Sequence, residues 1–296
     1  MSLRDIKLRI RSVKSTQKIT KAMEMIAASK MKRAQTQALK GRPYLQKLSQ
    51  IIADLVHLSE PKLTHPLLKT RRVKNIGYVF ITANRGLCGS YNTNVIRLML
   101  ETLQANQHAR EIVITVGKKG RQAMERIGKA VLADFETMSD KPGFLDTVGI
   151  SRVVMDDFLE KRLDEVWMVY SHFYSTASQK PVAVKLLPID PEKNLPRDRS
   201  EEGEEGEAAA RHLRKVDYIF EPSREMLLDE MLRRYVETMV YQTVLEAVAS
   251  EQSARMMAMH QAADNAEDIV SSLTLNYNKV RQTKITTEIL EVVAGT

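Results

Sequence analysis

The absence of glycine and proline from both ends of the chain limits the possible folds more than any other feature. Neither residue occurs in 1–40 or in 223–294, a window of 72 residues rich in Met, Leu, Ala, Glu, Arg and Gln. These side chains lose little freedom in a helix, and an unbroken helix over that window would be about 110 Å long. Because no compact domain has that diameter, the pattern predicts a coiled coil or a helical shaft.

Apolar and small residues recur in both windows at alternating steps of three and four, which is typical of helices that wind around each other. The N-terminal series is Leu3, Ile6, Ile10, Val13, Gln17, Thr20 and Ala27, and the C-terminal series is Leu232, Val236, Val240, Thr243, Ala247, Ser250, Ala254, Met257 and Gln261. Only the opposite end of the chain offers a partner of comparable length, which favours a mutual pair. Two long helices in a bundle would show the same periodicity.

Gly41 and Pro43 interrupt the first helical pattern, but apolar residues resume it from Tyr44 to Leu55. We therefore predict a kink at this point rather than an end, with the helix ending near Ser59 and Pro61. The helical segments accordingly span 1–60 and 221–296.

Between residues 70 and 220, short strands alternate with helices. Strands are expected at 76–82, 111–116, 131–135, 166–170 and 182–187, and helices at 92–105, 118–127 and 153–163. This alternation predicts an α/β domain with a parallel sheet, inserted between the two helical ends. Residues 191–215 differ from the rest because a Glu-rich run from Ser200 to Glu207 cannot bury apolar surface, so a solvated loop is expected there.

No residue pattern in the chain assembles into an active site. The run from Arg85 to Ser90 joins a strand to a helix, as phosphate-binding loops do, but it has neither the Gly-Lys-Ser/Thr ending of a P-loop nor the three glycines of the dinucleotide fingerprint. Cys88 has no histidine near it in sequence, and the six histidines are isolated. We therefore predict no catalytic residue, no cofactor and no metal site. An autonomous enzyme built on the α/β domain is the alternative.

Charge is distributed unevenly, although the whole chain carries a formal net charge of only +8. Residues 1–42 hold twelve Lys or Arg against two acids, a balance of +10, whereas residues 221–296 hold seven basic and twelve acidic residues, a balance of −5. The basic helix therefore faces an acidic partner, in part the opposite end. A basic coiled coil that binds nucleic acid is the rival interpretation, but residues 1–42 contain no aromatic side chain for base stacking.

Four runs of sequence closely resemble the gamma subunit family of F-type ATP synthases. They are Ile10–Met31, Asn84–Asn94, Glu251–Met259 and Leu275–Thr286, in order along nearly the whole chain. The resemblance implies a long antiparallel coiled coil of the N- and C-terminal helices with an inserted Rossmann-like α/β domain. It also implies a central rotor shaft in a proton-translocating ATP synthase, which couples rotation of the c-ring to conformational changes of catalytic beta subunits. In that family nucleotides bind to the hexamer of alpha and beta subunits.

The resemblance further implies which residues meet neighbouring subunits. Residues expected to contact beta or to couple rotation to catalysis are Met23, Lys18, Lys21, Arg255, Arg281, Gln282, Thr286, Glu288 and Glu291. Residues expected to face the c-ring and the epsilon subunit are Lys30, Arg33, Tyr218, Phe220 and Glu221. An apolar tip is expected to turn in a hydrophobic sleeve, and it consists of Ile285, Ile289, Leu290, Val292 and Val293.

Two further expectations concern location and regulation. The N-terminus lacks the apolar stretch of a secretory signal and no run approaches the roughly 20 apolar residues of a membrane span, so we expect a peripheral protein on the cytoplasmic face of a cell membrane. Contact with the membrane would then occur only through the complex. The Glu-rich insert falls where photosynthetic relatives carry a loop switched by two cysteines, but with one cysteine in the chain no thiol control is expected. The insert is then a charge-based brake or inert.

Overall fold

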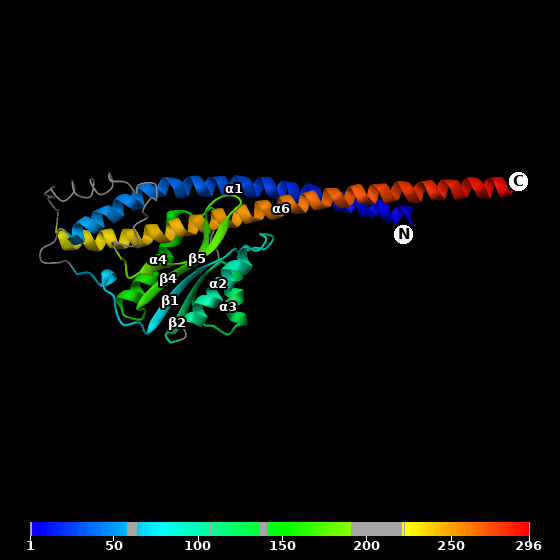
Figure 1. Ribbon diagram of the computed structural model, residues 1–296. Helices are drawn as coiled ribbons and strands as arrows, with labels where there is room; N and C mark the ends of the chain where they lie inside the picture. Colours follow the sequence, from blue (N-terminus) through cyan, green and yellow to red (C-terminus); the bar gives the residue numbers. More distant parts are fainter. Residues whose placement is uncertain are drawn as a thin grey trace.

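Two long helices lie side by side, and a small sheet domain packs against one end of the pair (Figure 1). The computed structural model describes residues 2–57, 64–106, 108–136, 141–190, 221 and 223–295. Helix α1 spans Leu3–His57, with 55 residues, and α6 spans Arg224–Ala294, with 71 residues. Both chain ends lie at the end of the pair remote from the domain (Figure 1), so the two helices run antiparallel.

Polar contacts between the helices fix this antiparallel register. Gln17 donates to Glu267 over 3.4 Å, Glu24 lies 3.3 Å from His260, and Gln242 donates to the carbonyl of Ala38 over 2.8 Å. In these three contacts the residue numbers on α1 increase while those on α6 decrease, which is the order that antiparallel pairing requires. The structure therefore confirms the expected coiled coil of the two chain ends.

Helix α1 continues through Gly41 and Pro43 without a break. Proline removes one backbone donor from a helix, and Figure 1 shows α1 bending toward α6 over its second half, in agreement with the expected kink. The expected end near Ser59 and Pro61 lies outside the described residues. Helix α6 begins at Arg224, three residues after the expected bound of 221, because the Ser223 side chain accepts a hydrogen bond from the backbone N–H of Met226 and caps the helix.

The domain is built on a five-stranded sheet in the order β3-β2-β1-β4-β5. The strands are β1 Asn75–Ile81, β2 Arg110–Val116, β3 Val131–Phe135, β4 Glu165–Phe173 and β5 Gln179–Leu187. Strands β1 to β4 are parallel, as predicted, but β5 is antiparallel to β4. The prediction of a purely parallel sheet was wrong there because residues 174–178 are too few for a crossover and form a hairpin connection instead.

Helices cover both faces of the sheet. Helices α2, Tyr91–Ala105, and α3, Lys118–Arg126, cover one face, where Tyr78 and Phe80 are buried. Helix α4, Phe144–Leu159, covers the other face together with α6 and the end of α1; a single turn, η1, spans Pro66–Leu68. Helix α4 begins before the predicted residue 153. The helix includes Gly149. A Cβ at this position would lie 3.2 Å from the Phe135 ring, so glycine permits close packing here and does not break the helix.

The buried face of α6 changes along its length, which the predicted series missed. Ala247 accepts a hydrogen bond from the Tyr91 hydroxyl, and Ala254 packs against Ala83, Cys88 and Tyr91. This part of the predicted series therefore faces the domain. Beyond the domain, Met257 and Gln261 are exposed, contrary to prediction, while Met259, Ala263 and Ala266 are buried. The reason is that, among the described segments, α1 is the neighbour of α6 there, and it lies on a different side of α6 from the domain.

Candidate functional site

The loop between β1 and α2 fastens the domain to α6. The Tyr91 hydroxyl donates to the Ala247 carbonyl over 3.3 Å. The Arg255 guanidinium donates to Glu251 over 2.7 Å and to the Gly86 carbonyl over 3.4 Å. Leu87 and Gly89 both have positive φ, at 61° and 57°, and these conformations turn the loop back onto the helix. The run from Arg85 to Ser90 therefore works as a tight strand-to-helix turn that docks on the shaft.

Burial suppresses acid–base chemistry in this loop. Burial is the main reason that the pKa of the Cys88 thiol lies above its usual range. Burial also raises the pKa of the Tyr91 hydroxyl well above its usual value. A thiol that keeps its proton is a poor nucleophile, and a neutral tyrosine remains a hydrogen-bond donor. The chemistry of these residues thus suits a structural joint.

A second joint ties the sheet to both helices. Glu246 on α6 accepts a hydrogen bond from the Tyr170 hydroxyl of β4 over 3.4 Å and lies 3.7 Å from the Arg42 guanidinium of α1. Burial is the first cause that raises the pKa of Tyr170, followed by the negative charge of Glu246. No pattern in the sequence pointed to this joint, because its members come from segments far apart in the chain.

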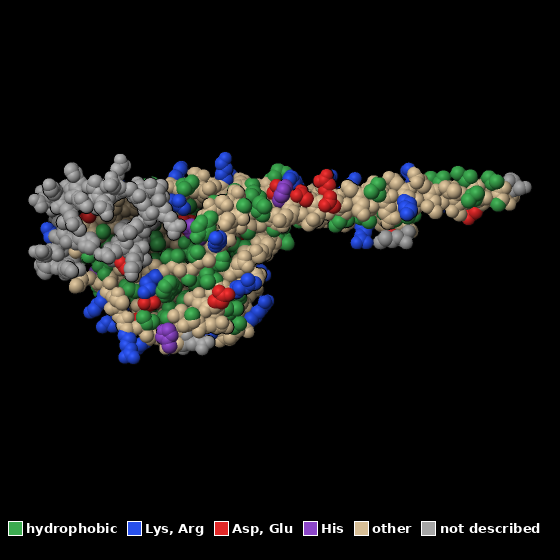
Figure 2. Space-filling view, viewed as in Figure 1, with side chains coloured by type: hydrophobic (Ala, Val, Ile, Leu, Met, Phe, Trp, Pro, Cys, Tyr) green, Lys and Arg blue, Asp and Glu red, His purple; other side chains and the backbone are tan. Residues whose placement is uncertain are grey.

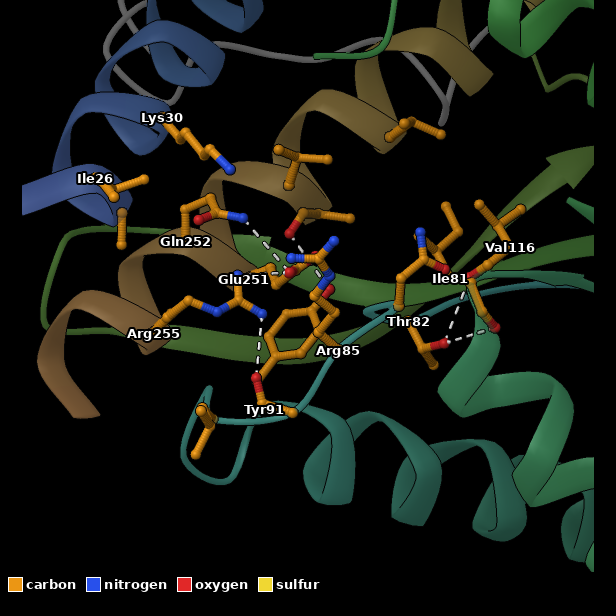
Figure 3. A pocket seen from close by; sticks show the side chains of 18 of the residues that line it. Ile26, Lys30, Ile81, Thr82, Arg85, Tyr91, Val116, Glu251, Gln252 and Arg255 are labelled. Atoms are coloured by element: carbon orange, nitrogen blue, oxygen red, sulfur yellow. Dashed lines mark hydrogen bonds and ion pairs between the residues drawn. The ribbon is translucent and has the colours of Figure 1, made fainter. Parts of the chain in front are cut away.

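A cavity of about 370 Å³ lies between the shaft and the carboxyl ends of β1 and β2. Figure 3 shows Ile26 and Lys30 entering from α1, and Glu251 and Arg255 from α6, on the side opposite Thr82 of the domain. Gly117 has a φ of 100°, and a Cβ there would lie 2.2 Å from the Thr82 carbonyl. The strand ends can approach each other this closely only with glycine at that position.

The residues expected to contact beta fall into two groups. Met23 is half-buried and lines the cavity, Lys18 is exposed, and Lys21 pairs with Glu24 over 3.0 Å. Arg255 is not on an open surface: its side chain is 12% exposed and is engaged by Glu251 and Gly86. These residues gather where α1 and α6 meet the domain.

The second group lies on the projecting end of α6. Arg281, Gln282, Thr286, Glu288 and Glu291 are all exposed. Side-chain contacts at this end of α6, such as that of Lys284 with Glu288 over 3.5 Å, are local to the helix. The expected apolar tip is exposed too, at 46% for Ile285 and 69% for Val292. Figure 2 shows a run of hydrophobic side chains at this end, past the start of α1. Such a surface suits a partner that surrounds the helix.

The residues expected at the c-ring and epsilon are only partly described. Lys30 is half-buried and lines the cavity, whereas Arg33 and Glu221 are exposed near the domain end. Tyr218, Phe220 and the acidic segment 191–215 lie outside the described residues.

Among the described residues, no group of three or more His, Cys, Asp or Glu side chains is placed to hold a metal ion. In the part of the chain that the structure describes, no helix is long and apolar enough to cross a membrane.

Comparison with known proteins identifies the family. A family model described as ATP synthase matches residues 2–296. The ATP synthase gamma chain of Dehalococcoides mccartyi is 44% identical over 295 residues, which cover 99% of this chain and 98% of the relative. The chain belongs to the family of ATP synthase gamma chains. The gamma chain of Heliobacterium modesticaldum is 42% identical over 293 residues, 99% of this chain and 97% of that one.

Solved structures agree with this membership. The central stalk and c-ring structure of Tetrahymena thermophila mitochondrial ATP synthase matches with a TM-score of 0.60 at 25% identity, covering 82% of this gamma chain and 99% of that chain. The rotor of Euglena gracilis mitochondrial ATP synthase matches with a TM-score of 0.60 at 20% identity, covering 96% and 98%, and supports the fold. These comparisons give no support to the nucleic-acid-binding alternative.

Proposed function

We propose that this gamma chain is the central-stalk rotor subunit of a proton-translocating ATP synthase. The whole-length match to gamma chains carries the proposal. The partners are the hexamer of alpha and beta subunits around the projecting end of α6, and the epsilon subunit and c-ring at the domain end. The chain is then peripheral on the cytoplasmic face of the cell membrane, and it touches the membrane sector only through the complex.

In this role, different parts of the chain have different tasks. Residues 1–60 and 221–296 form the shaft, and 70–220 form the foot that the ring turns. A rotor must transmit torque from the foot to the shaft without slipping. Two joints support this requirement: Arg255 fastens the loop between β1 and α2 to α6, and Glu246 fastens β4 to α6, each with a charged group. Catalysis belongs to the beta subunits, so the purified chain alone does not hydrolyse ATP.

Contact with beta is assigned to two groups of shaft residues. The half-buried Met23 and the exposed Lys18 and Lys21 belong to the group nearer the foot, and the exposed Arg281, Gln282, Thr286, Glu288 and Glu291 lie on the projecting end. Arg281 and Gln282 offer hydrogen-bond donors to a beta loop, whereas the apolar tip offers non-directional contacts that permit rotation. Lys30, Arg33 and Glu221 face the c-ring and epsilon, as do Tyr218 and Phe220.

Rotation of a labelled foot tests the proposal. Glu101→Cys places a thiol on the exposed face of α2, and the buried Cys88 thiol reacts poorly because its pKa is raised. With the assembled hexamer fixed to a surface and a bead on residue 101, ATP should drive rotation in one direction. A bead that only fluctuates while the complex hydrolyses ATP would contradict the rotor role.

A double substitution at the tip tests the residue assignment separately. Arg281→Ala with Gln282→Ala should lower ATP hydrolysis by the complex about tenfold, because each charge-assisted or polar bond contributes on the order of 1 kcal/mol. Both side chains are exposed, so the thermal unfolding of the isolated chain should not change. Full hydrolysis in the double variant would remove these residues from the coupling surface.

A further inference from the structure

We propose that Gln242 of α6 and Gly41 of α1 form a polar lock that fixes the bend of α1 and, with it, the angle between the shaft and the foot. Within the rotor, both are positioning residues, because they hold the foot and the shaft in one arrangement while the two turn together. That role rests on the proposed function, whereas the lock itself rests on contacts between the two helices.

The side chain of Gln242 crosses from α6 to α1. It is 6% exposed, and its amide nitrogen donates to the Ala38 carbonyl over 2.8 Å. Its amide oxygen occupies the space that a side chain at residue 41 would fill, since a Cβ on Gly41 would lie 2.7 Å from that oxygen. Glycine at this position therefore lets the amide of Gln242 reach the backbone of α1.

The residues at this crossing are individually unfavourable for stability. Glycine and proline both weaken a helix when they lie inside it, yet α1 contains Gly41 and Pro43. The amide oxygen of Gln242 is buried and has no hydrogen-bond partner among the described residues, which also costs free energy. Locally unfavourable residues occur where function requires one particular arrangement, and a buried polar side chain between paired helices is one means of fixing it.

The lock lies where α1 meets the foot. Beyond it, in the half of α1 that bends toward α6 (Figure 1), Leu45 and Leu48 pack into the same core as the sheet. One turn further along α6, Glu246 lies 3.7 Å from Arg42, the residue next to Gly41. The lock therefore adjoins the joint at Glu246, and together the two contacts hold α1, α6 and β4 in a fixed arrangement.

A double-mutant cycle tests the lock in the isolated full-length chain. In a Gln242→Ala background, Gly41→Ala should lower the equilibrium constant of unfolding about threefold, because alanine favours a helix more than glycine does. With Gln242 present, the same substitution should instead raise that constant about fivefold, because the added Cβ displaces the amide from the Ala38 carbonyl. Urea unfolding followed by circular dichroism compares all four proteins. If Gly41→Ala has the same effect in both backgrounds, the two residues do not act together and the inference is wrong.

Rotation of the assembled complex tests the positioning role. With a bead on Glu101→Cys, Gln242→Leu should at least double the variance of the bead angle during pauses of the rotor, because leucine preserves the packing but not the directional hydrogen bond. Gln261→Leu, at an exposed position of α6, is the matched control and should leave the variance unaltered. An unaltered variance for Gln242→Leu in a rotating complex would overturn the positioning role. A complex that does not rotate even with the unaltered chain would instead overturn the rotor proposal, and this role with it, while the double-mutant cycle would still decide whether the lock exists.

Discussion

The carboxylate of Glu246 on α6 lies 2.7 Å from Nδ1 of His172 on β4. The same carboxylate faces Arg42 of α1 and the hydroxyl of Tyr170, and its side chain is 12% exposed. One acidic side chain thus joins the sheet to both helices of the shaft. Because a buried carboxylate is costly unless its partners remain, this joint depends on all of its members.

Glu246→Gln should destabilise the chain by about 2 kcal/mol, because the neutral amide leaves His172 and Tyr170 with a weaker partner in a mostly buried place. Urea unfolding followed by circular dichroism measures the change. Glu101→Gln, on an exposed face of α2, is the matched control and should shift stability by less than about 0.5 kcal/mol. Equal effects of the two substitutions would mean that Glu246 does not hold the joint.

Gly117→Ala should cost about 3 kcal/mol in the free energy of unfolding. Its φ of 100° is strained for any side chain, and the added Cβ would lie 2.2 Å from the Thr82 carbonyl. Gly128→Ala separates the two causes, because Gly128 also has positive φ, at 70°, but its Cβ would meet nothing within 4 Å. That control should cost only about 1 kcal/mol. Should both variants lose the same stability, the clash with Thr82 contributes nothing.

Local patterns predicted most elements of the fold. The predicted strand 131–135 matches β3, and the predicted helices 92–105 and 118–127 differ from α2 and α3 by one residue at one end. The secondary structure of these segments could be predicted because their own sequences contain the turn residues and periodic apolar positions that determine it. The predicted start of α4 at residue 153 was wrong, because the helix begins at Phe144 and includes Gly149, which packs against the ring of Phe135 in a separate strand. The joints at Glu246 and Arg255, and the cavity, also depend on contacts between distant segments.

Two substitutions on α6 test which of its residues lie in the interface with α1. Sequence periodicity alone placed Met257 in the seam, but Met257 is 37% exposed whereas Met259 is 5% exposed. Met259→Ala should therefore destabilise the helix pair by about 2 to 3 kcal/mol, and Met257→Ala by less than about 1 kcal/mol. Thermal unfolding followed by helical ellipticity compares the two. A larger loss of stability for Met257→Ala than for Met259→Ala would mean that Met257 lies in the interface with α1, as the periodicity predicted. That result would contradict the observed burial of Met259.

Stability should fall in alkaline solution, partly because of Tyr78. Burial, aided by the negative charge of Glu111, raises the pKa of Tyr78 to about 12, against an ordinary value of about 10. The stabilising contribution is therefore fully present below about pH 10 and is lost as the pH rises toward about 12, since the unfolded chain releases this proton first.

Each proton of this kind contributes a slope of about 1.4 kcal/mol per pH unit across that interval. Tyr78→Phe should reduce the slope between about pH 10 and 12 by roughly this amount, while the slope below pH 9 should stay as it is. Urea unfolding at a series of pH values measures both. Tyr277→Phe on the shaft, where the side chain is outside the domain core, is the control and should leave the alkaline slope unaltered. An unaltered slope in Tyr78→Phe as well would show that the folded chain does not hold the Tyr78 proton more tightly than the unfolded chain.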